Sequence, residues 1–114
     1  MKVEKYANIV KKPVQVEGAK NVEMRLLISK DDGAANFVMR MFEVQPGGHT
    51  PLHKHPFEHE VFVIEGQGTL IYEGQDRKFS RDYVIFVPAD KEHRFKNTGD
   101  SVLRFLCLIP ASAA

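Results

Sequence analysis

The chain has 114 residues, which suits one domain with a single hydrophobic core and leaves no room for a second. Its 16 basic and 15 acidic residues give a net charge of +1, so we expect neither a basic nucleic-acid-binding face nor a polybasic membrane anchor. No run approaches the roughly 18 to 20 consecutive apolar residues of a membrane span. The N-terminal stretch scatters Lys and Glu among apolar residues, unlike a secretion signal. The single cysteine, Cys107, excludes a disulfide within the chain, and we expect a soluble, cytoplasmic protein.

Short runs rich in β-branched and aromatic residues alternate with turn sequences along the chain. The runs are 36–44, 61–65, 83–87 and 102–109, and the turns include 31–33, 46–48, 66–68 and 98–100. Many short strands at close turn spacing are typical of an all-β sandwich or barrel. Residues 22–29 (VEMRLLIS) leave two possibilities open, a helical turn or a strand.

Alternation along the expected strands indicates which histidines face the interior, because successive strand residues point to opposite faces. In 92–96 (EHRFK) the charged residues occupy one side, so His93 points inward from the other. His53 and His55 share one face, and a strand would separate them by roughly 6.5 to 7 Å. The same parity places His59 on that face, unless the proline in between shifts the register.

Histidines at 53, 55 and 59 fall within seven residues, and such a cluster has two interpretations. Several neutral imidazoles on an inward face are costly to desolvate unless each nitrogen finds a partner. A divalent transition metal would satisfy all of them, since imidazole suits Zn, Cu, Fe, Ni and Mn. The spacing therefore favours a metal site over the alternative, a structural or surface cluster of histidines.

Two stretches carry a family resemblance. In residues 47–66, five residues separate Gly47 from His53-Lys54-His55, and six residues separate His59 from Gly66. In residues 82–97, the sequence Pro88-Ala89-Asp90 is followed by His93 and Asn97. These stretches resemble the first and second motifs of the cupin superfamily. The resemblance implies an all-β fold over residues 1–114, a single-domain cupin jelly-roll barrel (double-stranded β-helix).

The resemblance also implies a set of metal ligands, His53, His55, His59 and His93. The metal-binding glutamate of the family falls on His59 when the motif is counted to Gly66, whereas Glu60 fits the spacing from His55. We assign His59, with Glu60 as the alternative. Such a set is similar to the small four-histidine cupins, which often hold manganese, so Mn is expected first, with Fe, Zn, Ni or Cu as alternatives.

The sequence departs from the family pattern at two turns. It also offers candidate residues for the wall of a pocket. Positions 82 and 90 carry Asp where the family has Gly, which concerns turn geometry rather than chemistry. Arg40 interrupts an apolar strand, either because the strand lies at an edge or a subunit contact, or because the guanidinium points inward to orient an anionic ligand. Phe105 and Cys107 share one face of the last strand and are expected in the barrel wall, with Cys107 as a small apolar residue or a reactive thiol. His49 is expected at the surface or the pocket mouth.

Three functions are compatible with this sequence. The first is a metal-dependent oxidoreductase of the dioxygenase type, because an all-nitrogen site keeps the full charge of the ion. The second is a Lewis-acid isomerase or lyase, for which the sequence offers no convincing proton-transfer group. The third is a binding module for a metal or small ligand without turnover. Outward residues such as Phe62 and Ile64 predict a homodimer that covers them.

Overall fold

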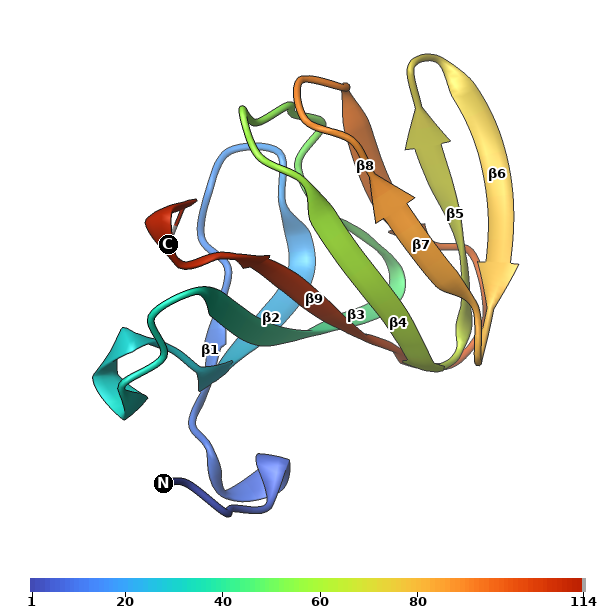
Figure 1. Cartoon of the computed structure of the whole chain (residues 1–114). Coiled ribbons are helices and arrows are strands. Elements are labelled where there is room, and N and C mark those ends of the chain that lie inside the picture. Colours follow the sequence, from blue (N-terminus) through green and yellow to red (C-terminus); the bar gives the residue numbers. More distant parts are fainter. Residues whose placement is uncertain (114) are drawn as a thin grey trace.

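Nine strands carry the fold of residues 1–113, the part of the chain described by the computed structural model (Figure 1). The strands are β1 (Lys11–Pro13), β2 (Lys20–Ile28), β3 (Phe37–His49), β4 (His59–Glu65), β5 (Gln67–Tyr72), β6 (Gln75–Ser80), β7 (Val84–Val87), β8 (His93–Asn97) and β9 (Leu103–Pro110). The 3-10 helices are η1 (Tyr6–Asn8), η2 (Lys30–Asp32) and η3 (Ala111–Ala113). Within these residues no helix is long and apolar enough to cross a membrane.

The strands form one antiparallel sheet that curls on itself. Its order is β6-β5-β8-β3-β9-β4-β7, and β2 also pairs with β3 and carries β1 on its other side. Figure 1 shows the β5–β6 hairpin and β8 at one end of the molecule, with β7 in front of them and β2, β3 and β9 running towards the other end. The predicted all-β jelly roll is confirmed.

The ambiguous segment 22–29 is a strand over all but its last residue. It lies in β2, which pairs with β3 so that Val22 is opposite Val44 and Met24 is opposite Phe42. These pairs share the inner face of the sheet, and burial of Val22 against the core settles the choice between helix and strand. The local sequence could not decide, because only the neighbouring strand supplies the partner.

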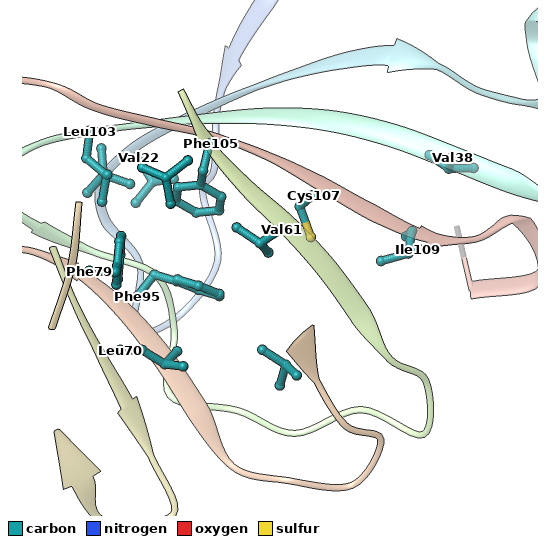
Figure 2. Packing of buried hydrophobic residues seen from close by; sticks show 13 residues of the cluster. Val22, Val38, Val61, Leu70, Phe79, Phe95, Leu103, Phe105, Cys107 and Ile109 are labelled. Carbon is teal, nitrogen blue, oxygen red and sulfur yellow. The ribbon is translucent and has the colours of Figure 1, made fainter. Parts of the chain in front are cut away.

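The hydrophobic core lies inside the curled sheet. Phe105 and Cys107 are buried as predicted, together with Leu103 and Ile109 on the same face of β9, and the residues between them are only half-buried. Figure 2 shows Phe79, Phe95, Phe105 and Leu103 grouped together, with Cys107 and Ile109 farther along β9. The rings of Phe95 and Phe105 stack with centroids 4.8 Å apart. This packing fills one part of the interior and leaves the region beside Cys107 for other side chains.

Two aspartates adopt the backbone conformation that the family gives to glycine. Asp82 has φ 74° and Asp90 has φ 63°, both in the left-handed region that Asp tolerates better than most residues. The backbone N–H of Asp90 donates to the carbonyl of His55 at 2.6 Å. The departures at 82 and 90 therefore preserve the turns, and one of these turns connects the two motif segments.

Asn97, the last residue of the second motif, has a structural role. Its amide group donates to the carbonyls of Val44 and Ser101, both at 2.8 Å, and its side-chain oxygen accepts the N–H of Gly99 at 2.9 Å. The side chain is 4% exposed. Asn97 thus closes the turn after β8 and fixes β8, which begins with His93, against β3.

Candidate metal centre

Three segments of the chain bring four histidines to one place inside the barrel. His59 is the first residue of β4 and His93 is the first residue of β8. His53 and His55 lie in the segment that precedes β4, where His53 forms an isolated bridge with His93. The N–H of His53 donates to the carbonyl of His93 at 3.1 Å, and the reverse bond measures 2.9 Å. This reciprocal pair joins the first motif to the second.

The four imidazole rings are neighbours. Centroids are 4.0 Å apart for His53 and His55, 5.0 Å for His53 and His93, 5.0 Å for His55 and His59, and 5.1 Å for His59 and His93. The ligating nitrogens of His53, His55 and His93 lie within 4.8 Å of one another. The structure therefore brings together the four predicted residues, with three in a tight group and His59 packed against it.

His59 faces the interior, and Glu60 does not. His59 is 5% exposed, and its Nε2 is buried with no hydrogen-bond partner within residues 1–113. Glu60 is exposed on the opposite face of β4. A buried, unpartnered nitrogen beside three other imidazoles is costly unless something accepts or supplies a bond there, and a cation among the four rings satisfies it. The residues thus fit a divalent transition metal.

The uncoordinated nitrogen of His93 is already oriented. Its Nδ1 lies 2.8 Å from the carbonyl oxygen of Lys91, which can only accept, so Nδ1 carries the proton. The Nε2 of His93 then has a free lone pair for a cation. The ring of His55 stacks on Phe57 with centroids 4.6 Å apart, and this contact fixes its plane.

Burial keeps the imidazoles neutral. Burial, followed by the nearby His55, lowers the pKa of His53 to about 4. Burial and then the Arg40 guanidinium lower the pKa of His59 to about 3. The pKa values of His55 and His93 are lowered as well, in both cases chiefly by burial. At neutral pH all four rings are uncharged, which is the form that binds metal.

A cavity of about 930 Å³ opens beside the histidines. Most of its lining is apolar, and its charged residues are Arg40, Arg94 and Glu17. The apolar lining includes Val14, Val16, Met24, Leu26, Leu52, Phe42, Phe57, Phe105 and Ile109. Valines from the segment between β1 and β2 were missed by sequence reasoning, because no periodicity in that segment relates it to the barrel interior.

Arg40, Phe105 and Cys107 line this cavity. Arg40 lies on β3, a central strand between β9 and β2, so its position is not explained by a sheet edge. Its Nη2 donates to Cys107 Sγ at 3.1 Å and lies 3.5 Å from His59 Nδ1, and within residues 1–113 it has no carboxylate partner. Phe105 is 1% exposed and Cys107 is 2% exposed. His49 lies outside the cavity lining, half-buried on β3, where its Nδ1 contacts the carbonyl of Thr50 at 3.3 Å.

Comparison with known proteins agrees with this geometry. The family model described as Cupin domain matches residues 40–109. The chain belongs to the cupin family. This cupin is similar to the oxalate-binding protein of Thermotoga maritima, at 34% identity over 95 residues that cover 81% of this chain and 78% of that protein. It is also similar to 1-methylthio-D-xylulose 5-phosphate methylsulfurylase of Rhodospirillum rubrum, at 32% identity over 73 residues that cover 64% of this chain and 47% of the relative.

Among solved structures, the cupin resembles the polyketide cyclase RemF from Streptomyces resistomycificus. The TM-score is 0.92 at 35% identity, over 97% of this chain and 80% of that chain. The match to the methylsulfurylase, by contrast, spans only about half the length of that relative. The family and its fold are therefore established, and three neighbouring histidines of this cupin could bind a metal ion.

We predict that His59→Ala loses the bound metal of protein purified without chelators, while Glu60→Ala keeps it. His59 Nε2 faces the histidine cluster, whereas the Glu60 side chain points away from it. Removing one of four ligands should weaken metal affinity by at least about 100-fold. Elemental analysis and chelator competition measure the affinity, and circular dichroism checks that both variants fold. Loss of metal in Glu60→Ala alone would show the assignment of the ligand to be wrong.

We also predict that the metal-free protein becomes less stable as the pH falls below about 6.5. The unfolded chain takes up protons near the ordinary histidine pKa of 6.5, but the folded pKa of His53 is about 4. Between these values the unfolded state binds more protons, so the free energy of unfolding decreases until about pH 4 and then levels off for this group. Urea denaturation in EDTA at several pH values measures the slope. His53→Gln should reduce this slope, because it removes the group whose folded pKa is lowered.

Proposed function

We propose that this cupin holds one divalent transition metal ion through His53, His55, His59 and His93 and uses it as a Lewis acid on an apolar carbonyl compound. The observation that carries the proposal is a group of neutral imidazoles beside an arginine without a carboxylate partner, in the wall of a large apolar cavity. Manganese is the expected ion, and Fe, Zn, Ni or Cu would suit the same nitrogens.

The charge of this interior suits an anionic oxygen. Four uncharged ligands would leave the full charge of a divalent ion, and Arg40 adds another positive charge beside His59. Glu17 is the one carboxylate of the cavity lining among residues 1–113, and it is exposed. An enolate, which carries its negative charge on oxygen, would be stabilised there more than the neutral ketone from which it forms.

The cavity wall and a relative together indicate the class of compound. A volume of about 930 Å³ with mainly apolar lining suits a molecule with several rings or a folded carbon chain. The structurally similar RemF is named a polyketide cyclase, and polyketide chains combine carbonyl groups with acidic α-hydrogens. We therefore propose a substrate of this type, with cyclisation or isomerisation through an enolate as the reaction.

The residues that line the cavity would have different roles in this reaction. A bound ion would polarise the substrate carbonyl, since this is the chemistry that a Lewis acid supplies. Arg40 would donate hydrogen bonds to the oxygen as its charge develops. Phe42 and Phe105, whose rings stack at 5.4 Å, would contact the apolar body and exclude water. Glu17, in the segment before β2, is the lining carboxylate that could accept the α-proton.

A metal-dependent oxidoreductase of the dioxygenase type is the second candidate. The uncharged ligand set that suits an enolate suits peroxide equally well, and the cavity leaves access to the histidines. The two candidates differ in one requirement, because only the oxidoreductase needs oxygen or peroxide.

We predict metal-dependent exchange of the α-hydrogens of 2-naphthylacetone for deuterium in D₂O under argon. Enolate formation at the proposed site needs the ion and Arg40, but it needs no oxidant. Arg40→Gln should lower kcat/KM by about 10- to 100-fold, whereas Arg77→Gln on β6, outside this cavity, should leave it unchanged. Mass spectrometry follows the exchange. Turnover that requires oxygen would favour the second candidate, and exchange that survives removal of the metal would contradict the proposal.

We further propose that two copies associate through the outer face of β4 and β7, as a homodimer. Phe62, Ile64, Val84 and Phe86 are 41%, 36%, 75% and 56% exposed there. Val84 lies opposite Phe62 in the register, and Phe62 in turn lies opposite Leu106 of β9. A second copy suits this face because a symmetric interface buries the same apolar patch twice.

The mass in solution tests the dimer. Sedimentation equilibrium should give twice the chain mass at micromolar concentration. Phe62→Asp should shift the protein to a monomer, because it places a charge in the centre of the apolar patch. Lys54→Asp, a change of charge away from this face, is the control and should remain dimeric. A strictly monomeric wild-type protein would contradict the proposal.

A further inference from the structure

Nitrogen atoms of two other side chains lie within hydrogen-bond distance of the sulfur of Cys107. Cys107 lies on β9, where it is paired with Arg40 of β3 on one side and with Val61 of β4 on the other. Arg40 Nη2 lies 3.1 Å from Sγ, and His59 Nδ1 lies 3.2 Å from it. The strand register thus fixes a basic side chain and a histidine around one buried thiol, which is 2% exposed.

Arg40 restricts how His59 can be protonated. A guanidinium group only donates, so Arg40 cannot accept a proton from His59 Nδ1, although Nη2 is 3.5 Å away. The acceptor within reach of a protonated Nδ1 is Cys107 Sγ. If instead Nε2 carried the proton, it would place a buried N–H among other imidazoles with no acceptor, because Nε2 has no partner within residues 1–113.

We propose that Cys107 is a positioning residue, whose sulfur accepts the Nδ1–H of His59 and so keeps the Nε2 lone pair directed at the cation site. The inference rests on the proposed metal site for its purpose. Its content, the position of one proton on His59, can be measured with or without a metal. It also assigns Arg40 a second task, since the bond from Arg40 holds the sulfur beside the ring.

An uncharged acceptor matters for the chemistry of this site. Metal-binding histidines commonly donate their other N–H to a carboxylate or a backbone carbonyl, and a carboxylate would offset part of the charge of the ion. In this cupin the Nδ1–H of His93 donates to the carbonyl of Lys91. The proposed acceptor for the Nδ1–H of His59 is the thiol of Cys107. Both histidines would therefore have uncharged partners, which would leave the charge of a bound ion undiminished.

Three substitutions at position 107 separate the acceptor from the packing. Cys107→Ser keeps an acceptor, Cys107→Val keeps volume without an acceptor, and Cys107→Ala removes both. Val61→Ala is the matched control, because Val61 is 4% exposed and lies opposite Cys107 in the register, yet offers no polar atom. Thermal unfolding identifies the variants that fold, and at least one acceptor-free variant suffices for the comparison.

Long-range ¹H–¹⁵N NMR of the metal-free protein reports which nitrogen of His59 is protonated, and chelator competition with Zn²⁺ reports affinity. We expect Nδ1–H in the wild type, Cys107→Ser and Val61→Ala, and a mixture of tautomers in Cys107→Val and Cys107→Ala. Zn²⁺ affinity should fall by about 10- to 100-fold in the two acceptor-free variants and change by less than about threefold in the others.

Two results would overturn the role of Cys107. One is a proton on Nε2 of His59 in the wild type, and the other is a wild-type tautomer and affinity in Cys107→Val. A wild-type protein that binds no Zn²⁺ or Mn²⁺ would instead reject the proposed metal site. In that case the NMR result would still decide whether the sulfur orients His59, so the two failures are distinguishable.

Discussion

The reciprocal backbone pair between His53 and His93 is the constraint on which the histidine cluster depends. It joins the segment before β4 to the beginning of β8, two parts of the chain that are 40 residues apart. The second connection, from the N–H of Asp90 to the carbonyl of His55, acts on the same two segments. Because these bonds involve only backbone groups, they hold the imidazoles together without using any imidazole nitrogen. This backbone connection therefore does not compete with a cation for the imidazole nitrogens.

The groups that surround these imidazole rings are mainly uncharged. Burial lowers the histidine pKa values, and the groups nearest to His59 and His93 are a thiol and a backbone carbonyl. The guanidinium of Arg40, which is positive, lies beside His59. An interior built in this way disfavours protonated histidines and favours anions. This combination of neutral rings and a positive guanidinium supports the binding of an enolate or peroxide more directly than the binding of a neutral ligand.

Away from the cavity, the buried carboxylate of Glu43 is paired with several basic side chains. Glu43 is 3% exposed and contacts Arg25, Arg104 and Lys11. Burial alone would raise its pKa, but the bonds from Lys11 and Arg104 lower it below the ordinary value. This cluster fixes β1 and β2 against β3 and β9, and so holds in place the segment between β1 and β2 that forms part of the cavity wall. Arg40, by contrast, has no carboxylate partner in residues 1–113, and this difference supports the proposed role of its guanidinium at the site.

The sequence by itself determined the fold class, several of the strands and the direction of most site residues. Alternation placed His93 and Phe105 inside, and the spacing of the first motif assigned the inward position to His59 over Glu60. These are local properties, because the side-chain period of a strand is fixed by its backbone. The resemblance to cupins supplied what parity could not, namely that the two motif segments meet.

Only the tertiary structure decided how those residues are arranged relative to one another and which other side chains they contact. The tight group of His53, His55 and His93, the valines of the cavity wall, and the contact of Cys107 with both Arg40 and His59 depend on strands that are distant in the chain. Curling of the sheet sets these distances, and the curl follows from the registers of all the strands together. No window of sequence contains that information, because a contact between β3, β4 and β9 exists only when all three have been placed.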